Sequence, residues 1–229
     1  MHIINTKALS LSVIRTLVFE GSKLKLSDEV IKKIEECREY LDQKIAKTTN
    51  PIYGINTGFG SLCDVRIHSE NLTKLQENLV RSHACGTGDL VPKSIIKLML
   101  LLKIKSLSYG HSGVQLETVN RLVSFYNNDI LPVIYTQGSL GASGDLAPLA
   151  HLALPLIGEG KVWYKGVQTA SSEVLSSFDW SPITLQSKEG LALLNGTQFM
   201  SAYGVHCLLK SFKLSYMADL IGALSLDAY

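Results

Sequence analysis

Apolar residues recur at helical spacing in several parts of the chain. The clearest case is "SDEVIKKIEECREYLDQKIAK" (27–47), where apolar positions follow one another three or four residues apart. Ser27 is a preferred helix N-cap, and acidic residues at 28 and 29 favour the positive end of the helix dipole. The pattern therefore predicts an amphipathic helix over 27–47.

Further helices are predicted over 69–83, 92–109 and 114–128, with a glycine-rich loop over 50–62 before the first of these. The stretch "IIKLMLLLKI" (95–104) carries Lys97 and Lys103 and is too short to span a bilayer, so it predicts a buried helix. Alternation around Tyr-Lys-Gly predicts a hairpin over 160–168. Residues 195–229 are apolar on almost every face, which predicts one long helix buried inside a bundle.

Composition adds an expectation about the context of this fold. Apolar residues make up 46% of the 229 residues and charged residues only 18%, which favours a subunit interface or a longer chain. No capping residue follows the last helix, so we expect the chain to be the front part of something longer. We predict a mainly α fold with small β elements: an N-terminal domain over 1–195, and over 196–229 the start of an incomplete helical bundle.

Charge and cysteine usage narrow the classes of partner. The net charge of +2 and the lack of basic blocks argue against nucleic acid, and no segment predicts a membrane span or a signal peptide. The cysteines are scattered without a C-x-x-C pair, which predicts reduced thiols and a cytoplasmic setting; they are Cys37, Cys63, Cys85 and Cys207.

The most unusual stretch is "GSLGASGDLAPLAH" (138–151), where three glycines surround Ser143. A nucleophile elbow, G-x-S-x-G, would need glycine at 145, where Asp145 stands. No Gly-Lys-Ser/Thr follows, and the glycine spacing differs from G-x-G-x-x-G, so phosphate and dinucleotide loops are excluded. One remaining interpretation is a turn in which Asp145 caps a helix beginning at Leu146.

A second interpretation is chemical. If the amide nitrogen of Gly144 attacks the carbonyl carbon of Ala142, a five-membered ring closes, and loss of two waters leaves a methylidene group at the former Ser143. Glycine suits this attack because its nitrogen is the least hindered and its backbone adopts unusual dihedrals. A helix N-terminus directly after the ring would stabilise negative charge that develops there.

With this chemistry, the stretch resembles the signature of the histidine and phenylalanine ammonia-lyase family. The prosthetic group of that family, 4-methylidene-imidazol-5-one (MIO), forms from an Ala-Ser-Gly triad, here Ala142, Ser143 and Gly144. Other stretches resemble family motifs in family order and cover most of the chain: "YGINTGFG" (53–60), "QENLVRSHACGTG" (76–88), "GHSGV" (110–114) and "EGLALLNGTQ" (189–198). One departure is Tyr135, where a proline is often found. The resemblance implies that the domain over 1–195 bears MIO, that no metal or external cofactor is needed, and that the protein is a homotetramer.

Three further site residues follow from the same resemblance. Tyr53 is similar to the tyrosine that lies over the prosthetic group and is proposed as an acid/base, although alone it would suit a packing role. Gly60 would let a substrate approach the backbone closely. Asn195 could be a simple N-cap of the long helix, but it is similar to the asparagine that contacts the prosthetic group or the substrate amine.

Ser82 and His83 bear on the substrate. A histidine at a helix end is often structural, but Ser-His resembles the pair of histidine ammonia-lyases, whereas phenylalanine-preferring relatives tend to carry Phe-Leu and tyrosine-preferring ones His-Leu. An imidazole facing the substrate's imidazole discriminates through hydrogen bonds. The resemblance therefore implies elimination of ammonia from L-histidine to give trans-urocanate.

Two alternatives remain open at this point. One is a phenylalanine or tyrosine ammonia-lyase or aminomutase that uses the same group. The other is a catalytically incomplete fragment or assembly module, because the resemblance implies that a second tyrosine, an arginine and a glutamate come from later in the chain and that several subunits build each site. We therefore expect little or no turnover by residues 1–229 alone. The other histidines show no metal-ligand spacing.

Overall fold

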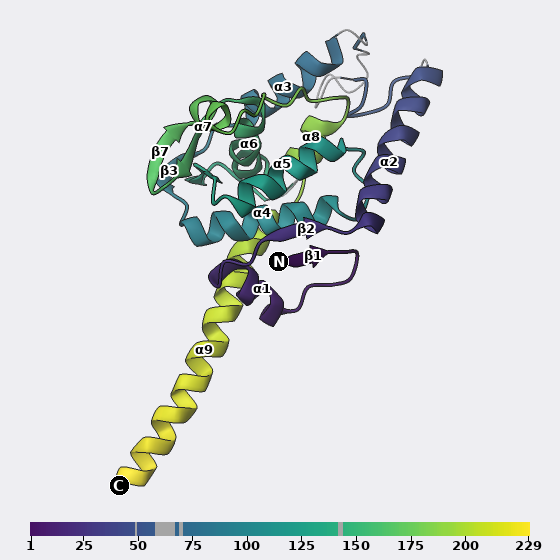
Figure 1. Cartoon of the computed structure of the whole chain (residues 1–229). Helices are drawn as coiled ribbons and strands as arrows, with labels where there is room; N and C mark the ends of the chain where they lie inside the picture. The colour runs from purple at the N-terminus through teal and green to yellow at the C-terminus, as the bar shows by residue number, and fades with distance from the viewer. Residues whose placement is uncertain (49, 58–66, 69–70, 142–143) are drawn as a thin grey trace.

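The computed structural model describes residues 1–48, 50–57, 67–68, 71–141 and 144–229 (Figure 1). These residues form a mainly helical fold, as the sequence predicts. The helices are α1 (Leu11–Phe19), α2 (Asp28–Lys47), α3 (Leu72–His83), α4 (Lys93–Leu107), α5 (Leu116–Asn127), α6 (Leu146–Ala153), α7 (Ser171–Ser177), α8 (Glu189–Leu194) and α9 (Gln198–Ala228), with a 3-10 helix η3 (Leu154–Ile157).

Among the residues that the structure describes, short strands form three small sheets. β1 (His2–Ile4) and β2 (Leu24–Leu26) pair in parallel, and β3 (Thr87–Leu90) pairs antiparallel with β5 (Tyr135–Gln137). The third sheet has the order β4 (Leu131–Pro132), β6 (Lys161–Tyr164), β7 (Val167–Ala170) and is antiparallel. The β6–β7 pair is the predicted hairpin.

The predicted helices agree closely with the observed ones. α2 begins directly after Ser27, whose hydroxyl accepts a hydrogen bond from the Val30 amide at 3.3 Å, so the predicted cap is confirmed. α4 and α5 end or begin within two residues of their predicted limits. α3 begins at Leu72, and the predicted start at 69–70 lies outside the described residues.

α4 is the centre of the hydrophobic core. Its residues 98–101 have no exposed surface, and α1, α5 and α9 all contact it. A helix that is apolar all round is stable only where other elements cover every face, which confirms the prediction from 95–104. Within the part of the chain described, no helix is both long and apolar enough to cross a bilayer.

α9 begins later than predicted and ends at Ala228, one residue before the predicted limit. It begins at Gln198 with Thr197 in the N-cap position, because Asn195 and Gly196 form the turn between α8 and α9. Its first turns contact α4, and beyond them it projects from the body of the molecule to the C-terminus (Figure 1). Only Ala202 of this helix is buried. Burial inside a bundle was predicted together with an incomplete bundle in this chain, and it stays a prediction. The exposed apolar side chains of α9 include Leu208, Phe212, Leu220, Ile221 and Leu224.

Candidate active site

The β3–β5 pair brings the end of α3 beside the turn that precedes the Ala-Ser-Gly triad. Thr87 pairs with Gln137 in this ladder. Gly86 and Gly138 lie so close that a Cβ on Gly138 would be 3.1 Å from the Gly86 Cα, and Gly138 adopts a φ of +129° that side chains rarely tolerate. Two segments that are about fifty residues apart in sequence therefore meet backbone to backbone.

A cavity of about 270 Å³ lies at this meeting point. Ser82 and His83 line it from the end of α3, and Gly144 lines it from the triad. The remaining lining residues are Cys85, Gly138, Ser139, Leu140, Gly141, Leu146 and Ala147. Its volume lies just below the range of roughly 300–1,000 Å³ that is usual for small-molecule sites. The structure thus places three of the predicted site residues around one cavity.

The imidazole of His83 has a defined orientation. Its Nδ1 lies 2.9 Å from the Leu79 carbonyl oxygen, one turn earlier in α3. Because a carbonyl only accepts hydrogen bonds, this contact assigns a hydrogen to Nδ1, which also lies 3.1 Å from the Ser82 hydroxyl oxygen. In the tautomer with the hydrogen on Nδ1, Nε2 is an acceptor. Ser82 also donates from its hydroxyl to the Leu79 carbonyl, at 3.1 Å.

The turn between α8 and α9 packs directly against Gly144, the third residue of the triad. A Cβ on Gly144 would be 2.8 Å from the Gly196 carbonyl oxygen and 3.1 Å from the Asn195 Oδ1. Gly144 has a φ of +106°, and it forms an isolated antiparallel bridge with Gly141. Only glycine fits this backbone conformation and this contact. Asn195 therefore presents its side-chain amide to the triad's third residue.

Asp145 stands at the N-cap position of α6, but its side chain does not cap that helix. One carboxylate oxygen accepts from the Met200 amide in the first turn of α9 at 3.0 Å, and the other accepts from the Ser139 hydroxyl at 3.2 Å. Its own amide donates to the Gly196 carbonyl at 2.8 Å. The prediction that Asp145 caps α6 is therefore wrong, because its buried carboxylate accepts from an amide of α9 instead.

Two buried charged residues that sequence reasoning did not connect with the site hold α8 at its ends. Glu189, fully buried at the start of α8, accepts hydrogen bonds from the Gln115 and Gln186 amides and from the Thr118 hydroxyl, at 2.7 to 2.9 Å. Lys103 on α4 donates from Nζ to the carbonyls that end α8. The available signal for Lys103 was its position inside an almost wholly apolar run.

His151 on α6 supports the same region. Its Nε2 accepts a hydrogen bond from the Gly86 amide at 3.0 Å, and the Tyr135 ring contacts its imidazole edge-on at 5.2 Å between centroids. Burial lowers the pKa of His151, which favours the neutral ring that can accept this bond. Tyr135, the departure from the family pattern, therefore packs against a residue that orders the turn after His83.

The other predicted site residues are placed differently. Tyr53 lies in a turn, is 55% exposed and does not line the cavity beside Gly144. Gly60, Ala142 and Ser143 lie outside the described residues, so their predicted roles stay predictions.

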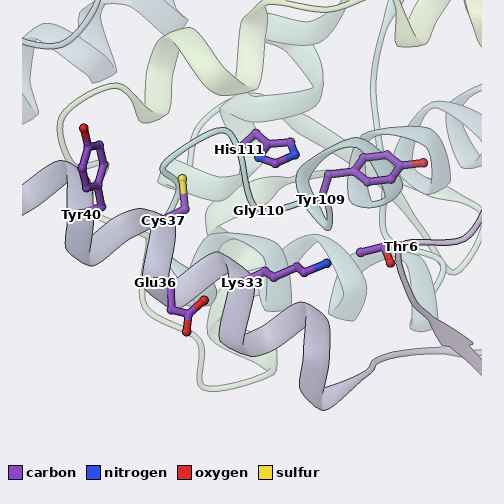
Figure 2. A pocket seen from close by; sticks show the side chains of 8 residues that line it. All are labelled: Thr6, Lys33, Glu36, Cys37, Tyr40, Tyr109, Gly110 and His111. Atoms are coloured by element: carbon purple, nitrogen blue, oxygen red, sulfur yellow. The ribbon is translucent and has the colours of Figure 1, made fainter.

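A second hollow, of about 400 Å³, lies between α2 and the loop after α4 (Figure 2). It is lined by Cys37 on α2 and by Tyr109 and His111 on the loop, and it contains none of the predicted site residues. Among the residues that the structure describes, no cluster of histidine, cysteine, aspartate or glutamate has the arrangement of a metal site.

The fold and the cavity beside the Ala-Ser-Gly triad define a class of protein. A family model of aromatic amino acid lyases matches residues 9–229. The chain belongs to the aromatic amino acid lyase family.

Individual relatives sharpen this assignment. The chain is 44% identical over 227 residues to the histidine ammonia-lyase of Halalkalibacterium halodurans, covering 99% of this chain and 44% of that protein. The crystal structure of histidine ammonia-lyase from Trypanosoma cruzi matches with a TM-score of 0.86 and 37% identity, over 95% of this chain and 42% of that one. The tyrosine aminomutase from Streptomyces globisporus matches with a TM-score of 0.82 and 35% identity, over 89% of this chain and 38% of that one. The chain spans less than half the length of these relatives.

Proposed function

We propose that this chain contributes the electrophile and the substrate-recognition pair of an enzyme that eliminates ammonia from L-histidine to give trans-urocanate. The observation that carries the proposal is the shared cavity in which Ser82 and His83 face the triad residue Gly144. The similarity to histidine ammonia-lyases over nearly the whole chain supports it.

The residues around Gly144 fit the prosthetic group that the family uses. Gly196 and the Asn195 amide fill the space that a side chain at position 144 would need, so only glycine fits there. Because glycine has no side chain, the Gly144 nitrogen is not hindered by one. Ala142, Ser143 and Gly144 would form MIO, which supplies an electrophilic methylidene carbon. No metal or external cofactor is part of the proposal.

The chain's own residues then bind the substrate and move a proton. The His83 Nε2 accepts a hydrogen bond from the substrate's imidazole N–H, since Nδ1 is engaged with the Leu79 carbonyl. Asn195 orients its amide toward the substrate amine. In its deprotonated form, the Tyr53 side chain takes a proton from the substrate's β-carbon in the assembled enzyme. In the single chain Tyr53 does not line the cavity beside Gly144, and its proposed role is supported by the "YGINTGFG" motif. The Cα–N bond breaks, ammonia leaves with the bonding pair, and a Cα=Cβ double bond forms.

The setting of the reaction is also a proposal. We infer a cytoplasmic homotetramer, because the exposed apolar face of α9 suits burial in an assembly and Cys37, Cys85 and Cys207 are free thiols. By this inference the isolated chain shows little or no turnover. The domain limit near residue 195 stays a prediction.

Two measurements test the proposal. Intact-mass analysis with peptide mapping of the purified chain should show a loss of two waters confined to residues 142–144, absent in Ser143→Ala. Fusing residues 1–229 to the remaining part of the Halalkalibacterium halodurans enzyme should give trans-urocanate from L-histidine, followed by its ultraviolet absorption.

The matched variant of this fusion replaces His83 with leucine. It should lose turnover of L-histidine by about two orders of magnitude, because the site then cannot pair with the substrate's imidazole. The runner-up function, a phenylalanine or tyrosine ammonia-lyase or aminomutase, is supported by the similarity to the tyrosine aminomutase. Formation of an unsaturated or β-amino acid from those substrates, with L-histidine inert, would establish the runner-up instead.

A further inference from the structure

Lys103 is an unusual residue for the middle of a core helix. It is 1% exposed, and its neighbours Leu100, Leu101 and Ile104 on α4 are completely buried. None of the ion pairs in the described part of the chain includes Lys103, and its pKa is lowered by burial alone. Burying a charged amine without a counter-ion is unfavourable, so Lys103 lowers the free energy of unfolding when its amine is protonated.

Its contacts show where its amine acts. The Lys103 Nζ lies 2.7 Å from the Ala192 carbonyl oxygen and 3.4 Å from the Asn195 carbonyl oxygen. Ala192 lies in the last turn of α8, where carbonyls have no partner within the helix, and a donor or cation at a helix C-terminus satisfies them. The protonated amine and the neutral amine each have enough N–H groups to serve both carbonyls.

The same backbone carries the contact with the triad. The Asn195 Oδ1 and the Gly196 carbonyl oxygen are the atoms that pack on Gly144, and the Gly196 carbonyl accepts from the Asp145 amide at 2.8 Å. Asn195 itself is exposed, and its amide donates to the Leu191 carbonyl at 2.9 Å, so the turn is held through its backbone. The lysine amine therefore holds the backbone of the one turn that presents an amide to Gly144.

We propose that Lys103 is a positioning residue that holds the Asn195–Gly196 turn against Gly144, through its hydrogen bonds to the Ala192 and Asn195 carbonyls. The proposal rests on the proposed function, which gives Asn195 and the triad their roles. Lys103 acts through that turn. Without its amine, the Asn195 amide moves relative to Gly144, so ring closure becomes slower and the substrate is oriented less accurately.

Lys105 offers a matched control on the same helix. It is also buried, at 7% exposure, and it donates from Nζ to a backbone carbonyl, but that carbonyl belongs to Asn5 near the N-terminus. Lys103→Met and Lys105→Met each remove one buried amine from α4. Only the first removes a contact with the turn at Asn195.

The experiment is hydrogen exchange of the Asp145 amide in the 229-residue chain, measured by NMR in wild type, Lys103→Met, Lys105→Met and Lys103→Arg. Exchange at Asp145 should be at least about tenfold faster in Lys103→Met and within about twofold of wild type in Lys105→Met, because local opening is set by local contacts. Lys103→Arg keeps the donors and should restore slow exchange. If Lys103→Met does not fold, Lys103→Gln and Lys105→Gln replace the two methionine variants, and the same difference in Asp145 exchange is expected between them.

Equal exchange at Asp145 in wild type and Lys103→Met, or equal acceleration in both methionine variants, would overturn the proposal. The two-water mass loss is followed in parallel and should be slower in Lys103→Met only. A wild-type chain without that loss, but with Lys103-specific exchange, would refute the proposed function and leave the positioning role intact. A normal mass loss in all variants together with unchanged exchange would refute the positioning role alone.

Discussion

Burial of Lys103 should make the stability of this protein depend strongly on pH above neutrality. Burial lowers the pKa of the Lys103 amine from 10.5 to about 7. Between these two values the unfolded chain holds a proton on Lys103 that the folded chain lacks, so the free energy of unfolding rises with pH. The full shift corresponds to about 5 kcal/mol, at about 1.4 kcal/mol per pKa unit. This stabilisation is complete above pH 10.5 and is lost as the pH falls to about 7.

The assay compares urea unfolding of wild type and Lys103→Met, followed by circular dichroism, at a series of pH values from 7 to 10. Methionine has a similar length and does not titrate, so subtracting the two profiles cancels groups such as Tyr126 and His151. The wild-type free energy of unfolding should increase relative to the variant by up to about 1.4 kcal/mol for each pH unit. Parallel profiles over this range would refute the reasoning, because they would mean that Lys103 keeps the same charge in the folded and unfolded chains.

Three further substitutions test the packing around the triad. Gly144→Ala places a Cβ 2.8 Å from the Gly196 carbonyl oxygen at a φ of +106°. Calorimetry should show that the free energy of unfolding falls by about 2–4 kcal/mol, and mass analysis should show no loss of water. The control Gly166→Ala has a φ of +87° but open space around the new Cβ, and it should cost only about 1 kcal/mol. Glu189→Gln replaces one carboxylate oxygen, an acceptor, with an amide donor, and should lower the free energy of unfolding in urea by about 3 kcal/mol. The exposed Glu173→Gln removes only a first-turn charge of α7 and should cost less than about 1 kcal/mol. Asp145→Asn should speed hydrogen exchange at the Met200 amide about tenfold, since that amide loses a charged acceptor, and unchanged exchange there would contradict the assigned bond.

The sequence predicted those elements whose structure depends on contacts between residues close together in the chain. The apolar spacing and Ser27 determined α2, because a helix depends on residues three or four apart and on its own cap. The Tyr-Lys-Gly turn determined the β6–β7 hairpin in the same way, with Lys165 and Gly166 in the left-handed region that such turns require. The motif at 138–151 likewise indicated the Ala-Ser-Gly triad, because the proposed ring closure involves only three successive residues.

Only the tertiary structure decided which distant residues meet. The pairing of Thr87 with Gln137 places His83 beside Gly144, and no periodicity in either segment specifies that pairing. Asp145 was expected to cap α6, but the packing of α9 brings the Met200 amide to its carboxylate, and that amide donates the hydrogen bond. Lys103 was visible in the sequence as a charge within an apolar run, but its function depends on where α8 ends in space. Long-range partners of this kind arise from how whole helices pack, so the sequence names the candidate residues and the fold assigns their contacts.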